Sequence, residues 1–298
     1  MKQSPSFQER PICDYEGSTY RTDFWGSQDR EYEDQVERLA IRALLPQRGE
    51  RLLDVGAGFG RLASLYHGYK KVILLDYSRS QLAYARQQLG DEGFIYVAAD
   101  LYTLPLATNA VDTTVMVRVL HHIADVPAAL QQIWRVTRPE GTFLLEFANK
   151  RHLKNILRYL LGRGVNPFSP EPYEFAKLHF DFHPRWVLEQ LLQAGFALQE
   201  RRSVSLFRAA LLKRIFPTPW LVKIDGLLQR PTAPLALGPS VFVRSRVLKK
   251  GQPKVAAEEV LFRCPSCGHE PLQSERSGLY CSQCGASWPL EEGIYVFK

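Results

Sequence analysis

The sequence of 298 residues has no stretch that marks export or membrane insertion. Its first 17 residues contain no apolar core of about seven residues, and no run of about eighteen apolar residues occurs anywhere without a charge. Cysteine is also scarce, since four of the five cysteines form two Cys-x-x-Cys pairs near the C-terminus and Cys13 stands alone. Paired cysteines favour metal ligation in a reducing compartment over disulfides. We therefore expect a soluble, cytoplasmic protein in which Cys13 is an ordinary thiol.

Acidic residues are sparse in the middle of the chain. The net charge is +7, but residues 151–250 hold 17 Lys/Arg against 6 Asp/Glu, which is +11. The flanking segments, 1–150 with 17 against 19 and 251–298 with 4 against 6, each carry −2. The basic character therefore belongs to one segment, and it bears on what that segment contacts.

Short apolar runs alternate with helix-length stretches in the first half of the chain. We expect strands at 51–55, 71–77, 93–99, 111–120 and 141–148, joined by stretches of helical length at 61–69, 78–90 and 126–141. Continuous apolar strands connected by helices are typical of a parallel sheet covered on both faces. Ser78 or Ser80 can cap the helix at 78–90 and Gly90 follows it, while Pro139 and Gly141 end the helix at 126–141. The predicted fold class is a doubly wound, Rossmann-like α/β sheet with ligands at the carboxyl ends of its strands.

A glycine-rich loop, "LLDVGAGFGR" at 52–61, directly follows the first predicted strand. Carboxylates end the first three strands, at Asp54, Asp76 and Asp100, and so should line one edge of the sheet. A dinucleotide is an alternative ligand, because "GFGRLA" fits the Gly-x-Gly-x-x-Gly/Ala fingerprint and Asp76 lies close to the expected spacing. A pyrophosphate loop has no use for Asp54 beside its anion, however. A ligand that combines a cationic amine, a sulfonium and an adenosine suits all three carboxylates.

At these residues the sequence resembles the class I S-adenosylmethionine-dependent methyltransferases, with a methyltransferase type 11-like core. The resemblance covers about residues 50–150 and rests on "DVGAGFG", "LLDYS", "AADLYTLPL", "VMVRVLHHI" and "RVTRPEGTFLLEF". It implies a seven-stranded sheet and S-adenosyl-L-methionine as cofactor. By position, the resemblance implies that Asp54, Gly56, Ala57, Gly58 and Gly60 bind the methionine portion. Asp76 and Tyr77 would bind the ribose, Asp100 and Leu101 would bind the adenine, and Val117 and Arg118 would border the sulfur.

The chemistry requires little beyond alignment, because methyl transfer from a sulfonium is an in-line displacement. His121 and His122 follow the fourth strand and are the candidate bases for an acceptor that arrives protonated, with His122 the more structural of the two. Arg118 departs from the small or neutral residue usual there, so it either binds an anionic group of the acceptor or is a solvated rim charge. No Asn-Pro-Pro-Tyr follows the strand and no cysteine lies near the site, which counts against amino-methylation by that motif and against covalent attack on a pyrimidine.

Two long additions leave from strand ends inside the methyltransferase domain, which we place at 51–248. These cap insertions span about 149–183 and 204–239, the second lying between a sixth strand at 197–204 and a last one at 240–247. The second insertion is predicted to form one helix with apolar residues on nearly all sides. Such a helix is either buried or covers an apolar acceptor, and a peripheral membrane surface is a candidate contact. His179 and His183 have metal-like spacing, but no third ligand is evident and His183 precedes Pro184 at a helix start. Residues 1–50 are expected to form a helical lid, with Tyr20, Arg21 and Trp25 as weak site candidates.

The C-terminal segment, 260–298, follows a charged linker at 249–259 and carries its own motif. Cys264, Cys267, Cys281 and Cys284 form two Cys-x-x-Cys pairs, and Gly268 and Gly285 follow each pair. This spacing predicts a structural zinc site with all four ligands supplied by thiolates. The ending "GLYCSQCGASWPLEEGIYVFK" resembles the small zinc-ribbon activator subunit of tRNA, ribosomal RNA and release-factor methyltransferases. Its charge of −2 argues against phosphate binding, so we expect it to dock on its own catalytic domain.

The sequence therefore predicts an S-adenosylmethionine-dependent methyltransferase that acts on a small, apolar or anionic acceptor. Among characterised enzymes the core is more similar to the quinone-biosynthesis and related small-molecule methyltransferases than to RNA-specific ones. A methyltransferase that acts on RNA or on a translation protein is the alternative, and a catalytically silent binding protein built on the same fold is a third reading. The intact Asp54, Gly56, Gly58, Gly60 and Asp76 speak against the third.

Overall fold

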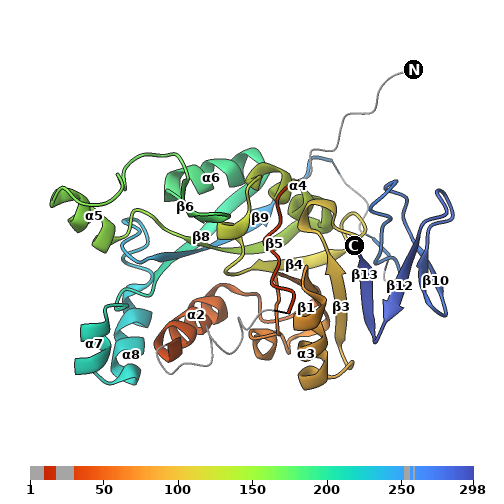
Figure 1. Cartoon of the computed structure of the whole chain (residues 1–298), viewed down its shortest axis with the longest axis horizontal. Helices are drawn as coiled ribbons and strands as arrows, with labels where there is room; N and C mark the ends of the chain where they lie inside the picture. The colour runs from red at the N-terminus through yellow and green to blue at the C-terminus, as the bar shows by residue number, and fades with distance from the viewer. Residues whose placement is uncertain (1–9, 18–29, 252–255, 258) are drawn as a thin grey trace, which may run out of the picture.

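The structure is a computed structural model that describes residues 10–17, 30–251, 256–257 and 259–298. Its centre is an eleven-stranded sheet in the order β10-β11-β12-β13-β3-β2-β1-β4-β5-β9-β8 (Figure 1). Neighbours among β1 to β5 run parallel, β9 is antiparallel to β5, and β8 is antiparallel to β9. The seven strands that follow the doubly wound prediction are β1 (Gly49–Val55), β2 (Tyr69–Asp76), β3 (Phe94–Ala99), β4 (Val111–Met116), β5 (Thr137–Ala148), β8 (Phe196–Val204) and β9 (Ser240–Val247).

The other four strands come from the C-terminal segment. An antiparallel meander of β10 (Gln273–Glu275), β11 (Gly278–Tyr280), β12 (Ser287–Glu291) and β13 (Ile294–Phe297) lies at one end of the sheet (Figure 1). β13 pairs in parallel with β3, placing Ile294 opposite Tyr96 and Phe297 opposite Ala99. The continuous sheet therefore has eleven strands, seven from the domain predicted as the methyltransferase sheet and four from the tail. The tail covers the row of backbone groups that β3 would otherwise expose as an edge strand.

Helices cover both faces of the sheet. One face packs against α4 (Val126–Val136) and α6 (Pro184–Gln193), and the other against α2 (Glu31–Leu44), α3 (Arg79–Leu89) and α8 (Thr218–Leu228). The side chains of Val36, Ala40 and Ile41 in α2 are fully buried. The helix expected in an N-terminal lid is thus a core element, because its apolar face packs on the sheet.

Several helix boundaries follow from residues that the sequence already marks. Ser78 accepts a hydrogen bond from the backbone N–H of Gln81 (3.3 Å), and Gly90 ends α3 with a φ of +74°. His183 caps α6 by accepting from the N–H of Arg185 (3.2 Å), so its predicted place at a helix start is confirmed. The fourth helix ends at Val136, before Pro139, because β5 begins at the next residue.

The expected helix at 61–69 is wrong. Only a short 3-10 helix, Ala63–Leu65, forms in this connection. Tyr66 and Tyr69 on either side of Gly68 both turn into the core, and the Tyr66 hydroxyl donates to Asp54 (3.0 Å). Anchoring two aromatic side chains inward over so short a connection leaves no room for regular helical turns.

The insertions contain α5 (Leu153–Leu160), a hairpin of β6 (Tyr173–Ala176) and β7 (His179–Asp181), α7 (Ala210–Ile215) and α8. The second insertion is not one helix, because Pro217 separates α7 from α8. Neither α5 nor α7 has a buried residue, so of the two alternatives for the second insertion, burial applies in α8 to Leu221 and Asp225 but not to α7. Figure 1 shows α5 and α7 at the end of the molecule opposite the tail. Within the described residues, no helix combines the length and apolar character needed to cross a bilayer.

Candidate cofactor site

A cavity opens at the carboxyl ends of the parallel strands, where the fold class places ligands. The predicted residues meet there because β1, β2, β3 and β4 lie side by side and all end at this edge. Ten of the eleven residues predicted to hold the cofactor line it: Asp54, Gly56, Ala57, Gly58, Asp76, Tyr77, Asp100, Leu101, Val117 and Arg118. Gly60 lies outside the lining.

The three glycines of the loop serve different purposes. All have positive φ, which favours glycine, but only at Gly58 would a Cβ meet open space. A Cβ on Gly56 would lie 2.2 Å from the Cγ2 atom of Val119, and one on Gly60 would lie 2.9 Å from Cδ1 of Leu89 in α3. A side chain would therefore project into open space only at position 58. The other two glycines allow the loop to pack against its own protein.

Asp54 is buried and Asp76 is partly buried, and both line the cavity. Asp54 accepts a hydrogen bond from the Tyr66 hydroxyl (3.0 Å), and burial raises the pKa of Asp54 to about 7. Asp76 accepts from the N–H of Gly58 (2.7 Å) through one oxygen and of Ser78 (2.8 Å) through the other, while burial raises its pKa. Each carboxylate oxygen can accept more than one hydrogen bond, so Asp76 can still accept from a bound hydroxyl. It also fixes the glycine loop to the end of β2.

Asp100 begins the turn after β3. One of its oxygens accepts from the N–H of Tyr102 (2.8 Å), and burial raises its pKa. This capping places Leu101, which is 9% exposed, and Tyr102 against the same cavity. A flat apolar group with an exocyclic amine would find both an acceptor and a packing surface here.

Arg118 lines the cavity but does not present a free charge. Its guanidinium donates to both carboxylate oxygens of Glu37, which is fully buried in α2, and Arg61 donates to the same carboxylate (3.0 Å). The backbone N–H of Arg118 donates to Glu146 (2.8 Å), which holds the residue at a φ of +60°. Neither sequence interpretation of Arg118, as an anion ligand or as a solvated rim charge, fits this arrangement.

The histidines after β4 differ in their surroundings. His122 lines the cavity, and its Nδ1 lies 3.0 Å from the carbonyl oxygen of Leu178, which can only accept. Its Nε2 therefore accepts from the Tyr15 hydroxyl (3.0 Å). His121 is not part of the lining, and the ring has no hydrogen-bond partner among the described residues. Burial, with the nearby His122 and Arg118, holds the pKa of His121 well below its ordinary value.

Residues 10–17 contribute the part of the site that the sequence analysis missed. Pro11, Ile12, Cys13 and Tyr15 line the cavity, and Arg10 pairs with Asp125 (2.8 Å). Burial raises the pKa of the Cys13 thiol, which keeps it protonated at neutral pH. No motif marks this segment, although its aromatic and apolar residues precede the first helix. The suggested candidates Tyr20, Arg21 and Trp25 lie outside the described residues.

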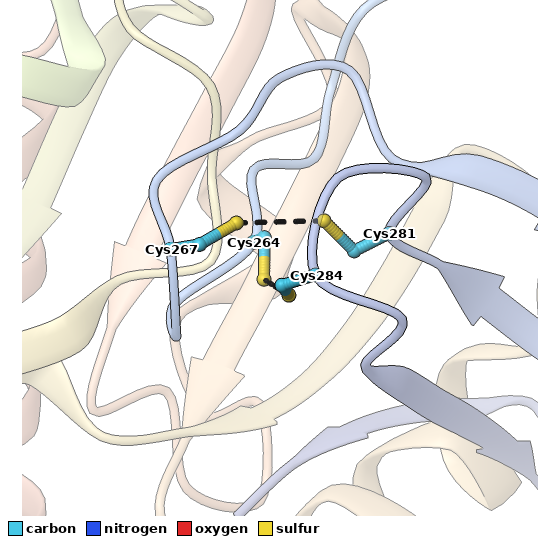
Figure 2. Close-up of side chains that lie close together, drawn as sticks. All are labelled: Cys264, Cys267, Cys281 and Cys284. Carbon is cyan, nitrogen blue, oxygen red and sulfur yellow. Dashed lines mark hydrogen bonds between the residues drawn. The ribbon is translucent and has the colours of Figure 1, made fainter.

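The four tail cysteines converge on a second site. Cys264 Sγ lies 3.7 Å from Cys284 Sγ and Cys267 Sγ lies 3.5 Å from Cys281 Sγ, as Figure 2 shows. A tetrahedron of sulfurs at about 2.3 Å from zinc has edges of about 3.8 Å, whereas a disulfide would require about 2.05 Å. The N–H groups of Gly268 and Gly285 donate to the carbonyls of Cys264 and Cys281, and both glycines have positive φ. The donor set and its turns fit a tetrahedral metal.

Asp54 makes ligand binding depend on pH. The pKa of Asp54 is raised to about 7 in the folded protein. The contribution of this carboxyl to stability is therefore present at a pH below the pKa that it has in the unfolded chain, and it is lost as the pH rises through about 7. A cationic amine beside it favours the ionised form. We expect S-adenosylmethionine to bind about fivefold more tightly at pH 7 than at pH 6, because a carboxyl with a pKa of about 7 is about half ionised at pH 7 and about one-tenth ionised at pH 6. Calorimetry at both pH values, with Asp54→Asn as control, measures this, and an equal pH dependence in the variant would contradict it.

The comparisons with known proteins agree with this geometry. A family model described as a methyltransferase domain matches residues 53–145. The chain is 32% identical over 198 residues to the demethylmenaquinone methyltransferase of Clavibacter sepedonicus, covering 62% of this chain and 81% of that enzyme. It is 28% identical over 180 residues to the corresponding enzyme of Chlamydia pneumoniae, covering 55% and 77%. It is 34% identical to the malonyl-[acyl-carrier protein] O-methyltransferase of Serratia marcescens, of which it spans about half, 49%, with 41% of this chain.

Solved structures share the fold. A putative S-adenosylmethionine-dependent methyltransferase from Listeria monocytogenes matches with a TM-score of 0.54 at 16% identity, covering 74% of this chain and 99% of that one. A chain in the complex between the Haloferax volcanii Trm112 methyltransferase activator and a putative methyltransferase matches with a TM-score of 0.53 at 20% identity, covering 78% and 97%. The matched domain and the relatives in sequence show the family, and the shared fold agrees with it. The chain belongs to the class I S-adenosylmethionine-dependent methyltransferases and is an enzyme.

Proposed function

We propose that the enzyme transfers a methyl group to a small apolar acceptor that it meets at an anionic membrane surface. S-adenosylmethionine, when bound, supplies the electrophilic methyl group. The cavity supports the residue assignments made from the sequence, with Asp54, Gly56, Ala57 and Gly58 toward the methionine portion and Asp76 with Tyr77 toward the ribose. Asp100 and Leu101 suit the adenine, and Val117 and Arg118 border the sulfur. The relatives named for demethylmenaquinone support an apolar acceptor.

The observation that carries the acceptor class is the distribution of exposed apolar side chains. Of the 20 large apolar side chains exposed in the described part of the chain, 16 lie in the two insertions. Leu157, Leu160 and Leu161 in and after α5 are 53%, 71% and 75% exposed, and Trp220 and Leu227 in α8 are 68% and 70% exposed. So many exposed apolar side chains in two segments indicate an interaction site rather than ordinary exposure.

The charge of the same segments favours an anionic partner. Residues 149–183 and 204–239 hold 11 Lys/Arg against 4 Asp/Glu, and one of the four acids, Asp225, is buried. Lys154, Arg158, Arg214 and Lys223 are exposed among the apolar side chains. Helices that combine apolar and basic residues bind in the interface of anionic bilayers, where each basic residue adds about 1 kcal/mol. The membrane surface is therefore the partner we propose for the insertions.

Labelled cofactor and a lipid extract test this proposal. The enzyme should transfer radiolabel from S-adenosylmethionine into an apolar product when the extract is presented in vesicles of phosphatidylglycerol and phosphatidylcholine. Replacing Leu157 and Leu160 with serine should lower vesicle binding at least about tenfold, since two partly inserted leucines are lost. Leu198→Ser, at a position on β8 where the side chain is 49% exposed, is the control outside the insertions. Label that enters aqueous RNA or protein, with equal vesicle binding by all variants, would instead support the alternative acceptors.

The roles of the two histidines after β4 are also proposals. We propose His122 as a residue that orients the site, because its Nδ1 faces Leu178 and its Nε2 faces Tyr15. His121 stays the proposed base for an acceptor that arrives protonated; it lies outside the cavity lining, and its depressed pKa makes the imidazole a weak proton acceptor.

We also propose that the tail binds a structural zinc ion through Cys264, Cys267, Cys281 and Cys284, and that the enzyme works in the cytoplasm. All four positions of a tetrahedral site would be filled by thiolates, so the metal would hold the fold and leave no open position for chemistry. The tail would belong to the same chain as the catalytic domain, whereas the Haloferax volcanii structure is a complex between an activator and a putative methyltransferase.

A further inference from the structure

The last residue of the tail reaches the rim of the cofactor cavity. Lys298 Nζ donates to the carbonyl oxygen of Tyr77 (2.6 Å) and lies 4.4 Å from the centroid of the same ring. Tyr77 directly follows β2 and lines the cavity beside Asp76. The lysine thus holds the backbone and the ring of one cavity residue from outside.

Lys298 also faces the segment that covers the cavity. Its Nζ lies 3.8 Å from the Glu16 carboxylate, and both groups are only partly exposed. Glu16 accepts from the backbone N–H groups of Arg79 (2.7 Å) and Ser80 (3.1 Å) at the start of α3. Burial raises the pKa of Glu16, but these hydrogen bonds and the charge of Lys298 outweigh burial and lower it, so the carboxylate is ionised. Residues 11–15, which line the cavity, precede this anchor directly.

A second contact from the tail reaches the same place. The guanidinium of Arg79 pairs with Glu291 (2.6 Å) and Glu292 (3.5 Å), which lie at the turn between β12 and β13. The segment from Tyr77 to Arg79, between the ribose carboxylate and α3, is therefore held by the tail at both ends. β13 itself is fixed by its pairing with β3.

We propose that Lys298 is a positioning residue of the cofactor site, through which the four-cysteine tail holds Tyr77 and the cover formed by residues 10–17 against the cavity. This inference rests on the proposed cofactor site. It assigns to the tail a direct effect on cofactor affinity in addition to its place at the sheet edge. Lys298 touches no reacting group, so its effect belongs in binding and not in the chemical step.

Replacing Lys298 with methionine tests the proposal, because methionine keeps the length of the side chain and removes its charge and donors. We expect the Kd for S-adenosylmethionine to rise roughly fivefold, the effect of one lost hydrogen bond to a binding residue. The turnover rate at saturating cofactor, the metal content per chain and the melting temperature of the unliganded protein should stay unchanged. Lys298→Arg should recover most of the affinity. Lys70→Met, which breaks a lysine–carboxylate pair with Glu50 at the other end of β2, is the matched control.

The outcomes separate this inference from the proposed site. Wild-type protein that does not bind S-adenosylmethionine would refute the cofactor site itself. Wild-type binding with an unchanged Kd in Lys298→Met would refute the role of Lys298 alone, as would an equal loss in Lys70→Met. Should Lys298→Met fold poorly, Lys298→Ala removes the same charge and donors, and an unchanged Kd in that variant would likewise overturn the proposal.

Discussion

Replacing Glu37 with alanine is expected to lower the free energy of unfolding by about 3–5 kcal/mol, because it leaves the partly buried guanidinium of Arg118 without its ion pair and leaves Arg61 paired with Asp34 alone. Glu37 is fully buried in α2 and accepts from both Arg118 and Arg61. Burial raises the pKa of Glu37, but the charges of Arg118 and Arg61 outweigh burial and lower it. The carboxylate is therefore ionised at neutral pH, and its removal costs the pairing of both arginines.

Urea denaturation of the wild type and the variant measures this effect. Glu31→Ala is the matched control, since Glu31 is exposed on the first turn of the same helix and accepts one hydrogen bond from Gln35 (2.8 Å). A surface change of this kind should stay within about 0.5 kcal/mol. Equal stability losses in the two variants would show that Glu37 contributes through helix formation and not through its ion pairs.

The same pair bears on the cofactor site. Arg118 has a φ of +60° and is held there by Glu146 at its N–H and by Glu37 at its guanidinium. Glu37→Ala should therefore also weaken cofactor binding, because Arg118 loses one of the two groups that fix it beside Val117. The affinities must be compared per folded molecule, so the unfolded fraction of each variant, taken from the denaturation data, is subtracted first.

The sequence predicted the site well where local order determines it. Asp54, Asp76 and Asp100 each follow an apolar strand, and a parallel sheet brings the ends of such strands to one edge. The convergence of these three carboxylates was therefore predictable from their order along the chain, whereas the other lining residues were assigned through the family resemblance. Gly60 was not separable from Gly58 in this way, because the difference between them lies in the contact of the loop with Leu89 and Ala85 of α3.

Contacts between distant segments were not predictable. Glu37 and Arg118 lie 81 positions apart, and no periodicity links an acid in one helix to a base after a strand. The helical pattern of the second insertion was visible, but whether its apolar residues are buried depends on what packs against them, and the structure leaves α7 on the outside. The cover formed by residues 10–17 has no motif, because its role depends only on where the chain passes the cavity.

Replacing Cys264 with serine is expected to release one zinc ion per chain and to destabilise the sheet together with the tail. Structural zinc contributes about 10–16 kcal/mol to the folding of small zinc peptides, and a segment of this size has little other core. Cys264 and Cys281 are fully buried, and they belong to the same apolar core as Val97 of β3 and Ala107. Loss of the metal therefore removes support from the central fold and is not confined to residues 260–298.

Elemental analysis and thermal unfolding measure the two effects. Hydrogen exchange of the β3 amides reports on the sheet, because the strand partners of β3 are β2 and β13, and release of β13 would expose one row of its backbone groups. Cys13→Ser, which changes a thiol outside the tail, should keep its zinc and its melting temperature. Zinc loss with unchanged protection of β3 would mean that the tail unfolds alone, and purified wild-type protein without zinc would mean that the four thiols serve another purpose. We expect β3 to lose protection, since the backbone of Ala107 also donates to Leu261 (2.8 Å) and that of Arg263 to Pro105 (3.0 Å), so the segment bearing Cys264 is itself bonded to the sheet domain.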